Sequence, residues 1–373
     1  MIKIEEIISV LKRNKIDFIS GVPDSLFKDL CFKFEKNYKN NHVVGANEGS
    51  SIGLAIGYHL ATGKIPLVYL QNSGLGNTIN PLVSLASHKV YQIPMILLIG
   101  WRGEIKNHKQ LKDEPQHKEQ GLITTKMLKT LNIHFKILNP KSNFKKVFSE
   151  IKLRTQKSSK PVALLVRKNI FLKSKKIKEK NSNNNFSREE ALKIVIDKLP
   201  KKYPLISTTG MLSRELNEIN LKINSEKKTF MCVGGMGHAV SIATGVALKK
   251  KHLKVVCLDG DGAITMHMGS LGTSAKVKNM FHIVFNNSSH DSVGGQKTAT
   301  DGIKYYKIAK SLGYKHCFRV KDKKKLIQLI TSSLKLKNSI FLEILCSKGN
   351  RPNLSRPKKK MITYKKLFIN FLK

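Results

Sequence analysis

The sequence predicts a protein of the parallel α/β class with two domains. Short, continuously apolar runs alternate with stretches of helical periodicity along most of the 373 residues. Such runs are typical of strands that are buried on both faces of a parallel sheet. The run LKSKKIKEKNSNNNF at 172–186 has no apolar period and is rich in Lys and Asn, a composition that favours a linker. We therefore expect domains at 1–171 and 187–373, joined by a linker at 172–186.

The first domain opens with a helical pattern, because the apolar residues of 4–11 recur at helical spacing. Phe18 and Ile19 then predict a strand, which ends in the turn sequence G-V-P. Three further apolar runs predict buried strands at 65–70, 95–100 and 161–167.

The second domain begins with a helix signal. Ser187 is followed three residues later by Glu190, ahead of an apolar-periodic stretch, and this spacing predicts a capping box. Apolar runs separated by helical patterns predict strands at 204–207, 255–258, 281–285 and 340–345. The two halves are similar in size, which is compatible with one fold used twice.

The net charge is the unusual feature of the composition. Lys and Arg number 68 and Asp and Glu 25, a formal charge of +43 at pH 7, which first suggests a nucleic-acid-binding protein. Only nine of the 68 basic residues are arginines, however, and Arg is the side chain that reads guanine and phosphate in bidentate geometry. The Lys excess therefore favours compositional bias, and we expect no nucleic-acid partner.

Cysteine usage and the lengths of the apolar runs indicate the compartment. The five cysteines are widely spaced, so the sequence favours neither a disulfide framework nor a structural zinc site. The start MIKIEEIISVLKRN has acidic residues where a secretion signal needs an apolar run, and no apolar stretch reaches membrane-spanning length. We expect a soluble, cytoplasmic protein with no membrane partner.

The strongest chemical signal follows two predicted strands of the second domain. The run D-G-D-G-A at 259–263 follows one strand, and Asn287 follows the next strand along the chain. Carboxyl ends of neighbouring parallel strands meet at one edge of a sheet, so Asp261 and Asn287 can converge on one ligand. Their oxygens suit Mg²⁺, and Gly260 and Gly262 let backbone N–H groups approach a phosphate. D-G-D-G alone is also good turn chemistry, but the paired Asn favours a binding site.

This G-D-G and N-N spacing resembles the diphosphate and magnesium motif of thiamine-diphosphate enzymes. The implied metal ligands are Asp261, Asn287 and the backbone carbonyl of Ser289. The implied cofactor contacts in the motif are Gly260, Asp261, Gly262, Ala263 and Asn287. The resemblance implies a fold of two parallel-sheet domains, of which the first binds the pyrimidine ring and the second the diphosphate.

Two other stretches extend the resemblance. In V-G-G-M-G-H-A at 233–239, Gly234 and Gly237 allow close approach to the cofactor, and Met236 matches the apolar wedge that bends it. The third glycine of a dinucleotide-binding loop is missing there. Glu48 opens a small-residue helix, where an acid also complements the helix dipole. The resemblance implies that Glu48 is the catalytic carboxylate that hydrogen-bonds N1′ of the cofactor, and burial would raise its pKa.

Five stretches narrow the resemblance to the phosphonopyruvate decarboxylases, over essentially the whole chain. They are S-G-V-P-D-S-L at 20–26, Q-N-S-G-L-G-N at 71–77, W-R-G at 101–103, D-E-P-Q-H at 113–117 and H-D-S-V-G-G-Q at 290–296. The chain length agrees, because these enzymes and the sulfopyruvate decarboxylases lack the middle domain of most relatives. The sequence departs from the pattern at Lys112, where His is expected, and at Val293, where Thr is more usual.

The resemblance implies a carbon–carbon lyase that uses thiamine diphosphate and Mg²⁺. It would decarboxylate 3-phosphonopyruvate without oxidation and release phosphonoacetaldehyde, a step of phosphonate biosynthesis. The implied catalytic residues are Glu48, Asp24, His117 and His290. The residues expected to contact the anionic substrate are Ser25, Asn72, Arg102 and Gln296. Ordinary alternatives stay open for some of them: Arg102 as a surface residue, Asp24 as a helix N-cap, and the two histidines as incidental loop residues.

Other functions also stay open. Sulfopyruvate decarboxylase is the nearest, because sulfonate and phosphonate are both tetrahedral anions, and another 2-oxoacid decarboxylase is a broader alternative. A non-catalytic cofactor-binding protein and a nucleic-acid-binding basic protein belong to different classes, and Glu48 argues against the former. The resemblance further implies a homodimer or homotetramer, since this family binds the cofactor between domains of two subunits.

Overall fold

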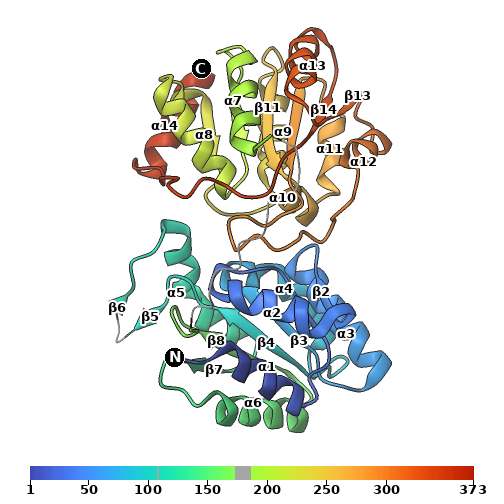
Figure 1. Ribbon diagram of the computed structural model, residues 1–373, viewed down its shortest axis with the longest axis vertical. Helices are drawn as coiled ribbons and strands as arrows, with labels where there is room; N and C mark the ends of the chain where they lie inside the picture. Colours follow the sequence, from blue (N-terminus) through green and yellow to red (C-terminus); the bar gives the residue numbers. More distant parts are fainter. Residues whose placement is uncertain (107–108, 173–185) are drawn as a thin grey trace. The chain divides into compact units, whose positions relative to one another are not determined.

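Each half of the chain folds as a six-stranded parallel sheet with helices on both faces (Figure 1). The computed structural model describes residues 1–106, 109–172 and 186–373. The chain divides into two units, residues 1–178 and 179–373, and each is described by itself. The linker expected at 172–186 falls almost entirely on residues 173–185, outside the described residues, so its bounds stay a prediction.

The sheet of the first unit has the strand order β2-β1-β3-β4-β8-β7. Its strands are β1 (Ile19–Gly21), β2 (His42–Val44), β3 (Leu67–Gln71), β4 (Met95–Gly100), β7 (His134–Leu138) and β8 (Pro161–Val166). Its helices are α1 (Ile4–Arg13), α2 (Lys28–Tyr38), α3 (Glu48–Thr62), α4 (Leu75–Pro81), α5 (Pro115–Thr130) and α6 (Phe144–Ser158). A short antiparallel pair, β5 (Ile105–Lys106) and β6 (Lys109–Gln110), lies outside the sheet.

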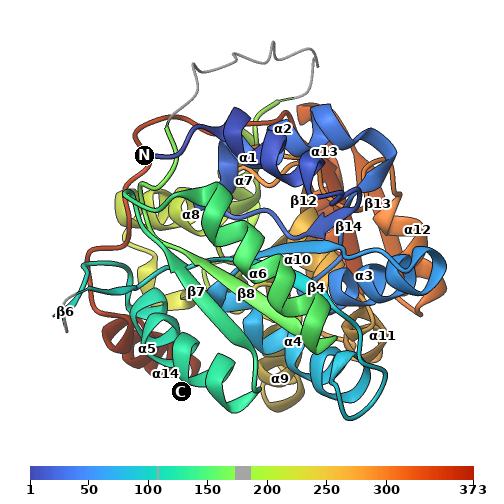
Figure 2. The same cartoon turned by 90° about the horizontal axis from the view of Figure 1, so that it is seen from below.

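Two apolar cores sandwich this sheet. Ile96 and Leu98 of β4 pack with α1, α2 and α6 on one face, whereas Leu97 and Ile99 pack with α3, α4 and α5 on the other (Figure 2). Successive side chains of a strand point to opposite faces, so a strand that is covered on both sides must be apolar throughout. This requirement explains the continuous apolar runs of the sequence.

The second unit repeats the topology of the first. Its strands, in the order β10-β9-β11-β12-β14-β13, are β9 (Leu205–Ser207), β10 (Thr229–Met231), β11 (Val255–Gly260), β12 (Met280–Asn286), β13 (His316–Val320) and β14 (Ile340–Leu345). Its helices are α7 (Arg188–Lys198), α8 (Met211–Lys222), α9 (Ala239–Lys249), α10 (Asp261–Met266), α11 (Ser270–Ala275), α12 (Tyr305–Ser311), α13 (Lys323–Lys335) and α14 (Met361–Leu372). When the six strands of each unit are counted in chain order, the two sheets have the same strand order.

The expected parallel α/β architecture is therefore confirmed, with two six-stranded parallel sheets and no middle domain in the described residues. The capping box at the start of α7 is also confirmed: the Ser187 hydroxyl accepts a hydrogen bond from the Glu190 backbone N–H, and the Glu190 carboxylate accepts one from the Ser187 N–H. Among the described helices, none is both long and apolar enough to cross a membrane.

Candidate active site

The second unit brings Asp261 and Asn287 together at the carboxyl edge of its sheet. Asp261 starts α10 directly after β11, and Asn287 follows β12, the neighbouring parallel strand. The backbone N–H of Asn287 donates a hydrogen bond to the Asp261 carboxylate. The convergence expected from the two strand ends is thus present.

The Asp261 carboxyl group is almost fully buried, with 3% of the residue exposed. This burial raises its pKa to about 7, although the Thr298 hydroxyl donates a 3.1 Å hydrogen bond to Oδ2 and backbone N–H groups stabilise the anion. A carboxylate that is this poorly solvated gains much from a nearby cation. Sequence reasoning did not find Thr298, which lies 37 residues away along the chain.

The loop after β12 supplies further oxygen atoms. Asn287, Ser289 and Asp291 form a turn in which the Ser289 N–H donates to Asn287 Oδ1 at 3.2 Å, and Asn287 Nδ2 donates to Asp291 Oδ2 at 2.6 Å. Asn287 and Ser289 are both buried, like Asp261. Together these residues offer the buried carboxylate of Asp261 and nearby amide and backbone oxygens. Such oxygens are the ligands of a hard divalent cation such as Mg²⁺, so these residues fit one.

Three separate segments meet around Gly262. A Cβ at this glycine would lie 2.8 Å from Cε1 of His290 and 3.3 Å from Cε of Met236, so the position has no room for a side chain. The structure thus places Met236 and His290 beside the D-G-D-G turn, next to Ala263. Burial lowers the pKa of His290 to about 4, so its imidazole is neutral at pH 7.

The glycines of these turns leave space for a ligand. Gly235 has a φ of +62° and Gly237 of +90°, which are conformations that glycine adopts readily. A Cβ at Gly235 or Gly260 would meet no atom of the described structure within 4 Å. Open backbone beside the buried oxygens of Asp261 and Asn287 fits a diphosphate. Gly234, an expected cofactor contact, directly precedes Gly235 in the chain.

A buried pair lies beneath the D-G-D-G turn. Asp259 of β11 and His282 of β12 lie on one face of the sheet beside Cys257, and His282 Nε2 is 3.5 Å from Asp259 Oδ2. Asp259 Oδ1 accepts a 3.0 Å hydrogen bond from the Gly260 N–H. Asp259 therefore holds the backbone of Gly260 at the end of β11. Sequence spacing alone does not reveal the pair, because Asp259 and His282 come from different strands.

In the first unit, Glu48 begins α3 and is buried, with 6% of the residue exposed. Its neighbour Asn47 caps the helix by accepting a 2.8 Å hydrogen bond from the Ser50 N–H. Burial raises the pKa of Glu48, against one hydrogen bond of 2.7 Å from Asn77 Nδ2 to its Oε2. The carboxyl group therefore favours its protonated form more than an exposed Glu does. Asn77 belongs to a quoted motif, but sequence reasoning gave it no role.

A second polar cluster of the first unit surrounds Asp24. Its Oδ1 accepts hydrogen bonds from Gln71 Nε2 at 3.0 Å, from the Leu26 N–H and from the Ser25 hydroxyl. Asp24 therefore caps the short helical turn at 25–27, which was its ordinary alternative, and it also lies in a polar cluster. Burial raises the pKa of this carboxyl group.

Arg102 lies beside this cluster, but most of its donors are occupied. Its Nε and Nη2 donate to the two oxygens of Asp113 at 2.8 and 2.6 Å, and its Nη1 donates to the Ser25 hydroxyl at 3.2 Å. Burial alone would raise the pKa of Asp113, but the hydrogen bonds from Arg102 hold it well below its usual range. An anion can approach Arg102 only from the Nη1 side, because Asp113 already holds the bidentate edge.

The remaining expected site residues occupy different places. The buried Asn72 amide donates to the Arg102 carbonyl and accepts from the Arg102 N–H, so it holds the backbone of this residue in place. His117 lies on α5 with Nε2 3.6 Å from Glu114 Oε2. Gln296 is buried, and its backbone carbonyl accepts a 2.8 Å hydrogen bond from the His290 N–H in the second unit.

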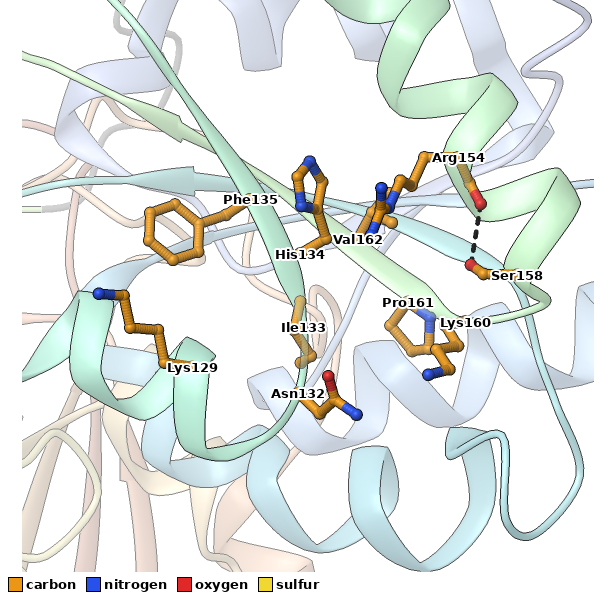
Figure 3. Close-up of a pocket in the computed structure, with 10 residues that line it drawn as sticks. All are labelled: Lys129, Asn132, Ile133, His134, Phe135, Arg154, Ser158, Lys160, Pro161 and Val162. Carbon is orange, nitrogen blue, oxygen red and sulfur yellow. Dashed lines mark hydrogen bonds between the residues drawn. The ribbon is translucent and has the colours of Figure 1, made fainter.

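A separate cavity of about 390 Å³ lies in the first unit at the amino ends of β7 and β8 (Figure 3). Lys129, Arg154 and Lys160 line it, near the carboxyl ends of α5 and α6. Basic side chains there complement the helix dipoles. The cavity lies at the amino ends of the strands, whereas Arg102 lies at the carboxyl ends, so the cavity does not belong to the candidate site.

Comparison with known proteins agrees with this geometry. Residues 4–127 match the thiamine pyrophosphate enzyme, N-terminal TPP binding domain, and residues 208–344 match the C-terminal TPP binding domain. A phosphonopyruvate decarboxylase from Streptomyces viridochromogenes is 27% identical over 96% of this chain and 92% of its own length. A sulfopyruvate decarboxylase from Methanosarcina acetivorans is 23% identical over 94% of this chain and 93% of its own length. The alpha subunit of sulfopyruvate decarboxylase from Methanococcus maripaludis is 32% identical over 43% of this chain and 92% of its own length.

Two cofactor-binding domains in this order define an enzyme that uses thiamine diphosphate. The chain belongs to the thiamine-diphosphate-dependent decarboxylase family that includes the phosphonopyruvate and sulfopyruvate decarboxylases. It is a carbon–carbon lyase that acts on a 2-oxoacid. The resemblance derived from the sequence motifs is thereby confirmed.

Proposed function

We propose that the protein decarboxylates 3-phosphonopyruvate to phosphonoacetaldehyde and CO₂ without oxidation, as a step of phosphonate biosynthesis, with thiamine diphosphate and Mg²⁺. The observation that carries this proposal is the full-length likeness to phosphonopyruvate decarboxylases. Those from Streptomyces viridochromogenes and Streptomyces hygroscopicus align over 96% of this chain and over 92% and 91% of their own lengths. The sulfopyruvate decarboxylase from Methanosarcina acetivorans is less similar, at 23% identity.

The second unit would hold Mg²⁺ and the diphosphate. We assign the cation to the Asp261 carboxylate, the Asn287 amide oxygen and the Ser289 backbone carbonyl, because these buried oxygens form the donor set described above. The open backbone at Gly235 and Gly260 supports an assignment of the diphosphate to these turns. Met236 would press against the middle of the cofactor. Thiamine diphosphate supplies the electron sink for the pair of electrons left by CO₂.

In the first unit, Glu48 would hold a proton at its buried carboxyl group. Its raised pKa favours the protonated form compared with an exposed Glu, and the hydrogen bond from Asn77 orients the group. A carboxyl group with these properties can donate a hydrogen bond to a ring nitrogen of the cofactor. Glu48 is therefore the residue that we expect to be indispensable for activity.

Recognition of the substrate requires donors for a carboxylate and a phosphonate. We assign this role to Ser25, Arg102, His117, His290 and Gln296, with Asp24 as an acid near the reacting carbons. Arg102 would use its Nη1, since Asp113 holds its other donors. Asn72 would act through the Arg102 backbone that it binds. The formal charge of +43 favours the approach of a multiply charged anion.

We further propose that the working form is a cytoplasmic homodimer or homotetramer, with each active site between subunits. Exposed apolar side chains on helices of both units support an association. In the first unit they are Leu54, Leu60, Ile79, Val83 and Leu85, and in the second unit Ile242 and Leu248. Such residues gain free energy when a second subunit covers them. Sedimentation at several protein concentrations tests this assembly, and a monomer that is active at all of them would contradict it.

One assay tests the proposed function and its nearest alternative. The purified protein, with thiamine diphosphate and Mg²⁺, is offered 3-phosphonopyruvate, sulfopyruvate and pyruvate, and aldehyde formation is followed for each. We expect the highest kcat/KM for 3-phosphonopyruvate and loss of activity in E48Q and D261A. A higher kcat/KM for sulfopyruvate would establish the alternative, which the likeness to the Methanococcus maripaludis subunit favours. No aldehyde from any of the three would refute both.

A further inference from the structure

Arg188 is a buried charge to which the proposed reaction assigns no role. It is the first residue of α7, and only 6% of it is exposed. Its Nε and Nη2 donate to the two oxygens of Glu215 on α8, both at 2.9 Å, and its Nη1 donates to Asp291 Oδ2 at 2.8 Å. The guanidinium group therefore joins the start of the second unit to the loop that follows β12.

Asp291 passes this connection on to the candidate metal ligands. Its Oδ2 accepts hydrogen bonds both from Arg188 and from Asn287 Nδ2, the latter at 2.6 Å. Its Oδ1 accepts from the Ser289 hydroxyl at 2.8 Å and from the Gly349 N–H at 3.2 Å. One buried carboxylate thus contacts both loop residues that would bind the cation.

These contacts decide which way the Asn287 amide points. A carboxamide can turn by 180° and exchange its oxygen for its nitrogen, and the surrounding hydrogen bonds select the orientation. The Asp291 carboxylate accepts hydrogen bonds only, so it fixes Nδ2 on its own side and leaves Oδ1 to accept from the Ser289 N–H and to bind a cation. If the amide turned, nitrogen would replace oxygen toward the cation.

Arg188 also balances the charge of this network. The side chains of Asp291 and Glu215 are only 4% and 1% exposed, and unpaired buried charges are costly. The five donors of a planar guanidinium group can bind two carboxylates at once, which a Lys ammonium cannot do in the same geometry. Without Arg188, Asp291 would be free to turn toward the solvent or toward a cation as a direct ligand, and its hold on Asn287 would weaken.

We propose that Arg188 and Asp291 are positioning residues of the cation site: Arg188 fixes the Asp291 carboxylate, which in turn presents the oxygens of Asn287 and Ser289 to the divalent cation. This inference rests on the proposed use of Mg²⁺ with thiamine diphosphate. Partners in the outer shell of a metal site typically change metal affinity by about 10- to 100-fold.

The test measures binding of Mn²⁺, as a probe for Mg²⁺, to the full chain with thiamine diphosphate, by the electron paramagnetic resonance signal of free Mn²⁺. R188K keeps the positive charge but loses the planar guanidinium group that binds two carboxylates. D291N keeps the shape of the Asp291 side chain but removes its negative charge. We expect each to raise the Kd for Mn²⁺ by about tenfold or more. Activity at saturating Mg²⁺ should recover to within about threefold of wild type, because the ligands themselves remain.

The matched control is R351K. Arg351 also binds carboxylates on α7 and α8, those of Glu189 and Glu218, but it is half-exposed and is not bonded to the loop at 287–291 in the described structure. Its Kd for Mn²⁺ should stay within about twofold of wild type. Thermal unfolding of each variant without metal shows whether the fold is kept, and D291N serves if R188K does not fold.

The outcomes separate the two proposals. If wild type binds Mn²⁺ with thiamine diphosphate and both R188K and D291N bind it equally well, the positioning role is refuted and the proposed cofactor use stands. A rise of the same size in the Kd of R351K for Mn²⁺ would also refute the positioning role, because the effect would then not be specific to the contacts of Arg188. If wild type binds no Mn²⁺, the proposed function itself fails, and this inference fails with it.

Discussion

Replacement of Gly74 by Ala tests the position of Glu48 without changing any ionisable group. A Cβ at Gly74 would lie 2.1 Å from Glu48 Oε1 and 2.3 Å from its Cδ. The backbone of Gly74 has a φ of −86°, which Ala adopts freely, so the substitution strains no dihedral angle. The three atoms nearest to the added methyl group all belong to the Glu48 side chain, so the substitution acts first on this residue.

The displacement can be estimated from the contact distance. Because Cβ atoms essentially never approach other atoms within 3.0 Å, the carboxylate must move by about 1 Å, which also stretches the 2.7 Å hydrogen bond from Asn77. A 1 Å misplacement in an active site can lower the rate by about 10²-fold. That loss corresponds to about 2.7 kcal/mol of transition-state free energy.

The assay is kcat/KM for aldehyde formation in G74A, with G76A as the control. A Cβ at Gly76, two residues along and inside α4, would meet no atom of the described structure within 4 Å. G76A should keep its activity within about threefold and gain up to about 1 kcal/mol in free energy of unfolding, because Ala favours a helix. If G74A folds and retains more than a third of wild-type activity, the proposed role of Glu48 is refuted.

Three other side chains provide separate tests. Burial raises the pKa of Glu48, so its ionisation weakens the folded state as pH rises. E48Q should therefore unfold at a higher urea concentration than wild type at pH 8 and lose this advantage below about pH 4. A difference in urea midpoint that does not depend on pH would contradict this reasoning. D113N replaces one of the two carboxylate oxygens that accept from Arg102 by an NH2 group, so Arg102 loses its bidentate partner and KM should rise about tenfold with a smaller change in kcat. An unchanged KM in steady-state kinetics would count against this prediction. S187A removes the capping box of α7 and should lower the free energy of unfolding, measured by urea denaturation, by about 1 kcal/mol. A urea unfolding curve with the same midpoint and slope as that of wild type would show that the cap is dispensable.

The strands that the sequence predicted are those that lie inside the sheets. Residues 95–100 and 340–345 are apolar because both faces of β4 and β14 are covered, and their bounds agree with the structure. The edge strands β7, β10 and β13 were missed. An edge strand needs less apolar surface, and most residues of β7 and β13 are only partly buried, so no continuous apolar run marks them.

The site was predictable to the extent that it depends on strand ends. Asp261 and Asn287 could be paired because each directly follows a buried strand, and the strands are neighbours. Thr298, Asn77 and Arg188 were not predicted as their partners, since each lies 29 to 103 residues from the group that it binds and carries no local pattern. Their contacts arise from loops that the fold brings together.

The sequence by itself determined the fold class, the two cofactor-binding motifs and the chemistry of their residues, because periodicity and strand-end residues are local properties of the chain. Only the tertiary structure decided which hydrogen-bond partner each polar group has. Arg102 was expected as a fork for an anion, yet its fork is held by Asp113. Asn287 was expected as a ligand, and the hydrogen bond from its Nδ2 to Asp291 Oδ2 sets the orientation of its amide. A polar side chain has several possible partners, and burial of the surrounding elements selects among them.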